Sequence, residues 1–290
     1  MNPENTALAL FELSENEADD QGRGHLGASQ IGEKCTRKLF YGFRWCSTSS
    51  FTGRILRLFR RGHLEESILV SDLANLPGVT VRTIDPETGE QYRFSDPELP
   101  GFAGSIDGIA YGLPEAPDQW IGLEIKTHNT KNFAALKKHG VESAYPKHFY
   151  QVQSYMFQSS LPAFLYLGLN KNDDHIYPEL IPYDAAAALM ARSTAHEVLT
   201  ASAPPPKISQ RADWFECKPA FCSHSEICHF KKKPAKSCRS CEHVNYNPKA
   251  DKWNCMLNLK KHGTKKPLDL EAQRAACNQY NPDPQIWKAG

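Results

Sequence analysis

Long apolar runs are missing from this sequence. No stretch approaches the roughly 20 apolar residues that a membrane-spanning helix needs, and residues 1–24 lack the basic start and apolar segment of a signal peptide. We therefore expect a soluble, cytoplasmic protein with no membrane partner.

An excess of charge of one sign is also missing. The 34 basic and 33 acidic residues leave a formal net charge of only +1, so total charge neither favours nor excludes a polyanionic partner. A nucleic-acid surface would have to be a local basic patch. With 40% hydrophobic residues over 290 positions and no internal repeat, the chain can bury one good core, or one core and a small appendage.

Cysteine, by contrast, is abundant and unevenly placed. The chain has nine cysteines, and all but Cys35 and Cys46 lie beyond residue 216. In a chain without an export signal, such clustering indicates metal ligands before disulfides.

The chain falls into three zones. Residues 1–24 are polar and acidic and predict a flexible N-terminal arm. Residues 25–202 alternate helical and strand patterns, as in a mixed α/β domain. The proline-rich segment SAPPPKIS then marks a break, and residues 203–290 form a small Cys-rich tail that predicts metal binding.

Two helices are predicted early in the middle zone. Ser29 is placed to cap a helix over SQIGEKCTRKLFYGFRW, and RILRLFRRGHLEESILVSDL has the spacing of an amphipathic helix. On the second helix, Glu66 lies in the apolar stripe, whereas Glu65 lies on a more polar row. Glu66 is therefore the better candidate for an inward-facing carboxylate.

A β-hairpin is predicted next, from the strands FAGSIDGIAYG and WIGLEIKTHN and the turn-rich LPEAPDQ between them. Alternation places Glu124 and Lys126 on one face of the second strand. Pairing brings Asp107, expected in the middle of the first strand, beside them. An isolated E-x-K pair is more often the solvent face of an edge strand, but converging carboxylates repel one another unless a divalent cation neutralises them. Oxygen ligands favour Mg²⁺ or Mn²⁺.

These motifs together resemble the PD-(D/E)XK nuclease superfamily. Asp107, Glu124 and Lys126 match its D-x16-E-x-K core, with Ile106 where the proline is often found. GHLEE is similar to the G-x-x-x-E motif of the RecB-like branch, PKHFYQVQSYM to its Q-x-x-x-Y motif, and SQIGEKCTRKLFYGF to its C-x-R-K-x-x-Y helix. The motifs follow one another in the order found in that branch.

The resemblance implies a restriction-endonuclease-like core, with a mixed central sheet flanked by helices, that hydrolyses DNA. The metal ligands that it implies for Mg²⁺ or Mn²⁺ are Glu66, Asp107, Glu124 and the carbonyl group of Ile125. The catalytic residues that it implies are Lys126, Glu124, Asp107, Gln151 and Tyr155. The candidate DNA contacts are Ser29, Arg37, Lys38 and His148.

The same resemblance favours an exonuclease over an endonuclease. It implies a phage or prophage role in DNA recombination, replication or end processing, with a single-strand annealing protein or another recombination factor as a partner. A phage-encoded protein of this kind would act in the cytoplasm of the bacterial host.

The cysteines divide into two sets of four, with Cys46 left over. The first set, Cys35, Cys217, Cys222 and Cys228, resembles that of related iron–sulfur nucleases and implies a [4Fe–4S] cluster, although its C-x4-C spacing is longer than the usual C-x2-C. The second set, Cys238, Cys241, Cys255 and Cys277, has the spacing of a structural zinc site. The histidines that could substitute as ligands are His224, His229, His243 and His262. Metal-free buried thiols and a single larger zinc assembly of the seven tail cysteines remain open alternatives.

Three other functional classes also remain open. A non-catalytic zinc or iron–sulfur DNA-binding or assembly module could keep the fold with an inactive site, and a zinc-finger binder would use the middle zone only as a scaffold. A redox enzyme is less favoured, because no C-x-x-C lies beside a strand-to-helix pattern. All the residues that the resemblance implies for an active site are present, which favours a nuclease over an inactive module: Glu66, Asp107, Glu124, Lys126 and Gln151.

Overall fold

The structure is a computed structural model that describes residues 3–18, 22–48, 51–257, 259 and 263–288. The chain forms two compact units. Unit 1 comprises Met1–Asp19, Ser50–Phe94 and Gly104–Ala191, and unit 2 comprises Asp20–Ser49, Ser95–Ala103 and Arg192–Gly290. The segment around Cys35 therefore belongs to the same unit as the Cys-rich tail, although the sequence zones place it with the middle domain.

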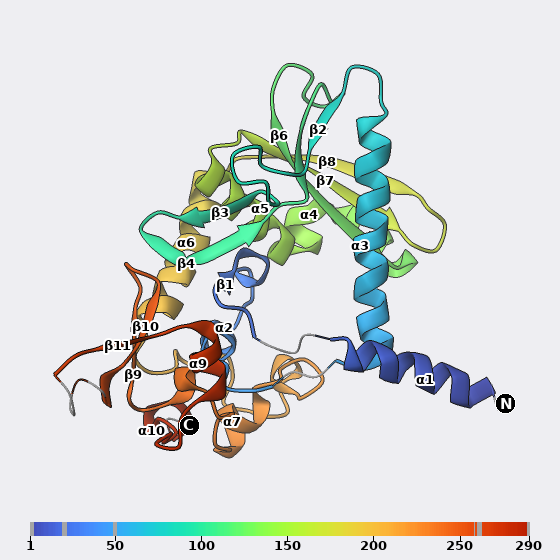
Figure 1. Cartoon of the computed structure of the whole chain (residues 1–290). Helices are drawn as coiled ribbons and strands as arrows, with labels where there is room; N and C mark the ends of the chain where they lie inside the picture. The colour runs from blue at the N-terminus through green and yellow to red at the C-terminus, as the bar shows by residue number, and fades with distance from the viewer. Residues whose placement is uncertain (1–2, 19–21, 49–50, 258, 260–262, 289–290) are drawn as a thin grey trace. The chain divides into compact units, whose positions relative to one another are not determined.

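Unit 1 contains a five-stranded sheet and its helices (Figure 1). Its elements are α1 (Pro3–Asn16), α3 (Gly53–Ala74), β2 (Thr80–Arg82), β5 (Gly108–Tyr111), β6 (Ile121–His128), α4 (Thr130–Ala144), α5 (Pro146–Ser159), β7 (Ala163–Asn170) and β8 (Ile176–Pro182). The strand order is β2-β5-β6-β7-β8. β6 and β7 are parallel and the other pairs are antiparallel, so the sheet is mixed, as predicted. Helices α4 and α5 make the crossover that a parallel pair requires.

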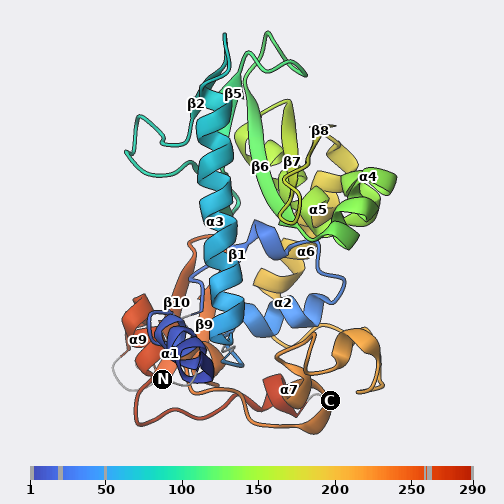
Figure 2. The ribbon, with the colours of Figure 1, turned by 90° about the vertical axis from the view of Figure 1, so that its right-hand side faces the viewer.

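The two faces of β6 have different partners. Ile121, Leu123 and Ile125 are buried in the apolar core, together with Leu69 of α3. Figure 2 shows α3 on one side of this sheet and α4 and α5 on the other. Glu124 and Lys126 alternate with the apolar residues, and their side chains pair with each other. The predicted alternation along this strand is confirmed.

The predicted hairpin is confirmed, but Asp107 is not in the middle of its first strand. β5 and β6 pair antiparallel with Gly108 opposite Leu123. Asp107 lies in the short break between β4 (Leu99–Ser105) and β5, where its Oδ2 accepts a hydrogen bond from the backbone N–H of Ile125 at 2.7 Å. The carboxylate thus takes the place of a backbone partner beside β6, which is the physical reason why the strand pairing begins only after it.

Residues 3–16 of the predicted flexible arm form helix α1 instead, which packs against the start of α3. The first N–H of α3, at Gly53, donates to Glu15 Oε1 at 2.6 Å. A Cβ atom at Gly53 would lie 2.1 Å from the carbonyl oxygen of Phe11, so only glycine permits this approach. Glu15 thus satisfies one of the N–H groups that the start of a helix leaves without an intrahelical partner.

Unit 2 contains short elements and small sheets. They are β1 (Leu26–Gly27), η1 (Ala28–Gln30), α2 (Thr36–Phe43), η2 (Phe215–Cys217), α7 (Ser225–Phe230), η3 (Cys238–Ser240), β9 (Val244–Asn247), β10 (Lys252–Cys255), β11 (Lys266–Leu268), α9 (Leu270–Ala275) and α10 (Pro284–Trp287). The chain crosses between the units within β3 (Arg93–Asp96), β4 and α6 (Ala185–Thr200). β9, β10 and β11 form an antiparallel sheet.

The start of the first predicted helix is corrected by the structure. α2 begins at Thr36 with Cys35 as its N-cap residue, and Ser29 lies in the separate turn η1. The Ser29 hydroxyl accepts a hydrogen bond from Arg23 at 3.0 Å instead of capping α2. The predicted helix merges these two elements because the apolar spacing continues across the turn.

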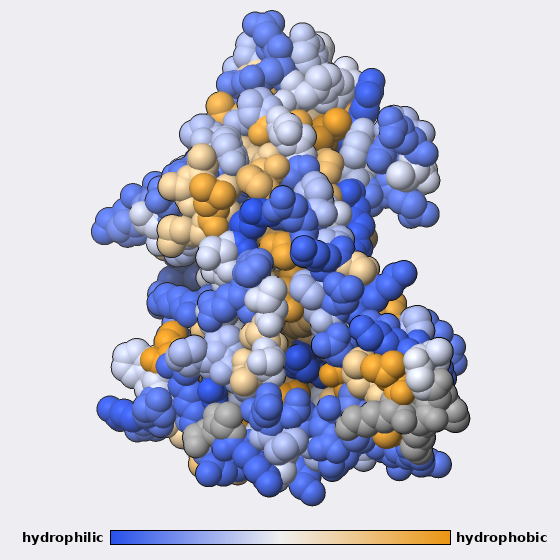
Figure 3. Space-filling view, turned by 90° about the vertical axis from the view of Figure 1, so that its left-hand side faces the viewer, coloured by the Kyte–Doolittle hydropathy of each residue, from blue (hydrophilic) through white to orange (hydrophobic). Residues whose placement is uncertain are grey.

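No helix in the described part of the chain combines the length and the apolar character needed to cross a bilayer. On the face shown in Figure 3, apolar residues occur in small groups among hydrophilic ones.

Candidate functional site

A buried glutamate is at the centre of the site in unit 1. Glu124 has no exposed surface. Its Oε1 accepts a hydrogen bond from Gln151 Nε2 at 2.8 Å and forms an ion pair with the Lys126 ammonium group. Among the described residues, no group donates a hydrogen bond to the equally buried Oε2. A buried carboxylate oxygen without a donor is unusual and fits a position that a cation would occupy.

Asp107 and the backbone of Ile125 adjoin this glutamate. Asp107 Oδ2 accepts from the N–H of Ile125, and the carbonyl oxygen of Ile125 accepts from Lys126 Nζ at 3.1 Å. The Asp107 carboxylate, the Ile125 carbonyl and the Glu124–Lys126 pair are thus held together at one point of β6. The structure brings together these predicted residues.

Glu66 supplies the third carboxylate from α3. Burial raises the pKa of Glu66, and the negative charge of Asp107 raises it further, while Lys126 and His63 act in the opposite direction. Its neighbour Glu65 forms an ion pair with Arg61 at 3.3 Å. The helix periodicity thus favoured Glu66 over Glu65, and Glu66 is the glutamate whose charge acts on Glu124 and Lys126.

Around Glu124, the negative charges of the carboxylates outnumber the one positive charge of Lys126. Burial raises the pKa of Glu124 to about 7, and Asp107 and Glu66 add to this effect although Lys126 opposes it. For Lys126, burial alone would lower the pKa, but Glu124, Asp107 and Glu66 outweigh burial and raise it. The three carboxylates repel one another, Lys126 offsets part of this repulsion, and carboxylate oxygens are the ligands that Mg²⁺ and Mn²⁺ prefer.

The predicted pair on α5 supports Glu124. Gln151 and Tyr155 lie one turn apart and are both buried. Gln151 Nε2 contacts Glu124 and also lies 3.2 Å from the Tyr155 hydroxyl oxygen. Gln151 therefore touches the carboxylate directly, whereas Tyr155 acts through Gln151.

Two residues of the site, His128 and Tyr166, were not identified from the sequence. The Tyr166 hydroxyl on β7 lies 3.0 Å from His128 Nε2 and 2.8 Å from Nδ1 of the predicted His148. Tyr145 stacks on the His148 ring. His128 continues the Glu124–Lys126 alternation, and this signal could have found it. Tyr166 pairs with Glu124 across the sheet, which only the register reveals.

Burial and the Lys126 charge lower the pKa of both imidazoles of this group. The pKa of His128 falls to about 4 and that of His148 to about 3. Both rings are therefore neutral near pH 7, and the single Tyr166 proton can be donated to only one of them. His148 is fixed in one orientation at the margin of the carboxylate cluster.

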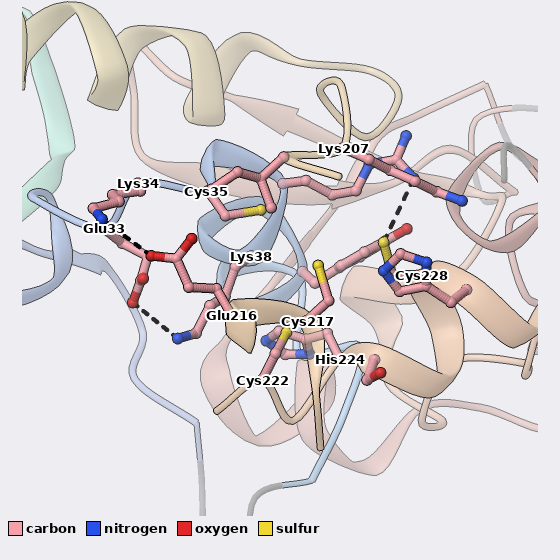
Figure 4. Close-up of a pocket in the computed structure, with 15 residues that line it drawn as sticks. Glu33, Lys34, Cys35, Lys38, Lys207, Glu216, Cys217, Cys222, His224 and Cys228 are labelled. Carbon is pink, nitrogen blue, oxygen red and sulfur yellow. Dashed lines mark hydrogen bonds and ion pairs between the residues drawn. The ribbon is translucent and has the colours of Figure 1, made fainter. Parts of the chain in front are cut away.

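The first cysteine set gathers in unit 2. Cys35, Cys217, Cys222 and Cys228 all line one pocket, and Figure 4 shows their sulfur atoms turned toward the same space. Cys35 comes from the start of α2, and the other three come from the segment that includes η2 and α7. His224 and His229 line the same pocket. The four thiols that the resemblance grouped therefore line one pocket.

Arg37 and Lys38, predicted to contact DNA, also line this pocket. Arg37 is only 6% exposed, and its guanidinium group donates to the carbonyl oxygens of Pro205 and Pro204 and contacts the Cys228 sulfur at 3.9 Å. Lys38 donates to Glu33 and to the Phe221 carbonyl. These contacts bury Arg37 and half-bury Lys38, because residues of the tail cover this side of α2.

The second cysteine set gathers around a different pocket of unit 2. Cys238, Cys241, Cys255 and Cys277 line it together with His243. They come from η3, from the end of β10 and from the segment after α9. Three tail cysteines thus line the first pocket together with Cys35, and the other four line the second. Cys46 is buried and lines neither pocket. His262 lies outside the described residues.

All nine cysteines carry free thiols. Within the described ranges, no group of three or more His, Cys, Asp or Glu side chains is arranged as a preformed metal site. This holds for the two cysteine sets, which share pockets, and also for Glu66, Asp107 and Glu124 in unit 1.

Comparison with known proteins yields only distant structural similarity. No family model matches the chain, and no curated protein is significantly similar to it. LHK-Exo in complex with dAMP aligns with a TM-score of 0.45 and 17% identity, over 66% of this chain and 90% of that chain. The alkaline exonuclease LHK-Exo from Laribacter hongkongensis aligns with a TM-score of 0.42 and 16% identity, over 66% and 90% of the two chains. SSO0001 aligns with a TM-score of 0.41 and 17% identity, over 77% and 96%. At these TM-scores the neighbours assign no activity, and the side chains of the site itself support the functional inference.

Proposed function

We propose that this chain is a metal-dependent nuclease that hydrolyses phosphodiester bonds in DNA. The observation that supports it most directly is the arrangement around Glu124. Glu124 pairs with Lys126, the charges of Asp107 and Glu66 act on it, and no described residue donates a hydrogen bond to the buried Glu124 Oε2. A solvent-facing charge pair on an edge strand would show neither the burial nor the convergence.

The residues of this cluster divide the chemistry among them. A divalent ion, Mg²⁺ or Mn²⁺, held by Glu66, Asp107, Glu124 and the Ile125 carbonyl would neutralise charge on the scissile phosphate and lower the pKa of a water molecule. Lys126 would orient the attacking water and offset negative charge in the transition state.

The helix α5 and its surroundings position this machinery. Gln151 holds Glu124 through its 2.8 Å hydrogen bond, and Tyr155 holds Gln151. His148, held by Tyr166 through its Nδ1, would donate from its other ring nitrogen to the DNA backbone at the margin of the site. Ser29 and Lys38 remain proposed DNA contacts, whereas the buried Arg37 is better suited to stabilise the cysteine pocket.

We propose exonuclease action at DNA ends before endonuclease action, in recombination, replication or end processing of the phage type. These details rest on the resemblance of the sequence motifs. A single-strand annealing protein or another recombination factor is the proposed partner, and the cytoplasm is the proposed location.

The two cysteine sets are the proposed sites of further cofactors. Four thiols on one pocket, with a guanidinium group beside Cys228, fit a negatively charged [4Fe–4S] cluster at the first set. The second set fits Zn²⁺. Visible absorbance and metal analysis of anaerobically purified protein test both assignments without any measurement of activity.

The nuclease proposal is tested with end-labelled linear DNA and closed circular DNA, each with Mg²⁺, Mn²⁺ or EDTA. We expect metal-dependent degradation of the linear DNA and an intact circle. Cutting of the circle would change the assignment to an endonuclease.

Matched variants identify the site. Asp107→Ala and Glu66→Gln should reduce cleavage at least about 100-fold, because each removes a carboxylate from the cation position. Glu65→Gln is the control, since Glu65 pairs with Arg61 on the same helix and should retain activity. If folded, fully metallated wild-type protein binds DNA without cleaving it, the chain is a non-catalytic binding module and the nuclease proposal fails.

A further inference from the structure

Arg239 connects the second cysteine set to the rest of unit 2. It lies in η3, within the four-residue C-x2-C segment that begins at Cys238 and ends at Cys241. Its side chain is only 1% exposed, which makes it one of the largest fully buried side chains described. A lone arginine inside a short loop is an improbable core residue unless something holds the loop in place.

The Arg239 guanidinium group donates hydrogen bonds to three partners that lie far away in the sequence. Nη1 donates to the carbonyl oxygen of Phe43 at 2.9 Å, and Nη2 donates to that of Gly24 at 2.8 Å. Nε donates to Gln273 Oε1 at 2.7 Å. Phe43 ends helix α2 and Gln273 lies on α9, so this single side chain ties the start of the unit to its end.

Aromatic rings surround the same group. The guanidinium carbon lies 3.8 Å from the centroid of the Trp45 ring, 4.8 Å from that of Trp253 and 5.2 Å from that of Phe43. Cation–π contacts of this kind replace part of the hydration that a buried cation loses. The arrangement tolerates little displacement, because each hydrogen bond and each ring contact needs the group at one position.

The local chain offers little else to fix that position. β9, β10 and β11 are strands of three or four residues, and η3 is a single turn. Elements this short bury few apolar side chains, chiefly Tyr246 and Trp253, and leave much of the stabilisation to other contacts. The thiols of Cys238 and Cys241, on either side of Arg239, face a pocket that Cys255 and Cys277 also line.

We propose that Cys238, Cys241, Cys255 and Cys277 bind one structural Zn²⁺ and that this ion locks Arg239 into its aromatic cage, so that the tail clamps helix α2. The inference deepens the proposed zinc site and is independent of nuclease activity. Cys35 is the N-cap residue of α2, so a clamp on α2 would also help to position Cys35 in the first cysteine set.

The site assignment is tested by metal analysis of purified full-length protein. We expect one zinc per wild-type chain and loss of that zinc in Cys238→Ser and Cys277→Ser. Cys46→Ser is the matched control, since Cys46 is buried outside both pockets, and it should retain zinc. Retained zinc in Cys277→Ser together with loss in His243→Asn would overturn the four-cysteine assignment, as would iron in place of zinc.

The clamp is tested by a thermal-unfolding cycle with Arg239→Met, with and without a zinc chelator. Arg239→Met should keep its zinc but lower Tm by roughly 5–10 °C. Zinc removal should lower the wild-type Tm by more than it lowers that of Arg239→Met, because the ion acts through this side chain. Two additive decreases in Tm would show that zinc and Arg239 act independently and would overturn the clamp. None of these readouts uses DNA cleavage, so failure here is distinct from failure of the nuclease proposal.

Discussion

The hydrogen bond from Gln151 to Glu124 allows a quantitative test of the site. Gln151→Leu keeps the approximate volume of the side chain on α5 but removes the Nε2 donor that lies 2.8 Å from Glu124 Oε1. Glu124 then retains only Lys126 as a partner for that oxygen. The ammonium group is drawn more firmly to the carboxylate, and the cation position loses its fixed ligand.

The expected size of the effect follows from the charge and burial of Glu124. A hydrogen bond to a charged, buried group contributes about 1.5–3 kcal/mol. Since about 1.4 kcal/mol corresponds to a factor of ten, we expect a combined loss of roughly 10- to 100-fold in kcat and in apparent Mg²⁺ affinity.

The assay is a titration of cleavage rate against Mg²⁺, with Gln153→Leu as control. Gln153 lies on the same helix and is also buried, but its amide donates to the Pro182 carbonyl and accepts from the N–H of Asp184. The control should lose stability and keep its Mg²⁺ response. If Gln151→Leu loses stability but keeps the wild-type kcat and Mg²⁺ midpoint, then Gln151 has only a structural role and the reasoning about Glu124 is refuted.

Three further predictions concern other parts of unit 1. Lys126→Gln should lower kcat by about 10²- to 10⁴-fold while a gel-shift assay shows DNA binding retained, and normal turnover in this variant would exclude Lys126 from the chemistry. Gly122→Ala should destabilise the chain by about 1–3 kcal/mol in urea unfolding, because the new Cβ would lie 2.2 Å from the Phe164 ring; an unchanged midpoint would contradict the packing at this position. Burial lowers the pKa of His128 to about 4 and of His148 to about 3, below the ordinary value of about 6.5, so the unfolded chain binds more protons at acidic pH. The free energy of unfolding should therefore fall as pH is lowered from 6.5 toward 4, and should fall less in His148→Gln than in wild type; equal slopes would refute the assignment of buried neutral imidazoles.

Local sequence patterns were sufficient for much of the site. The helical periodicity separated Glu66 from Glu65, and strand alternation placed Glu124 and Lys126 on one face of β6. Both patterns repeat within a few residues, so they express which side of a single element meets the core. The resemblance to iron–sulfur nucleases grouped the first cysteine set and spacing grouped the second, and each set lines one pocket.

Other features depended on contacts that no local pattern encodes. Tyr166 joined His128 and His148 only through the register of β6 and β7, and Arg37 became buried only when Pro204 and Pro205 covered it. The placement of Asp107 inside a strand was wrong because it ignored the hydrogen bond of its side chain to β6, and the predicted cap at Ser29 was wrong because the apolar spacing continues across the turn η1.

The amino-acid sequence by itself determined which residues could perform chemistry and which side of their own helix or strand they occupy. Only the tertiary structure decided which of them meet, as when Arg239 reaches the carbonyl oxygen of Gly24 across 215 positions of the chain. The physical reason is that side-chain periodicity is a property of one element, whereas burial and hydrogen bonding of a polar group depend on the elements that fold against it.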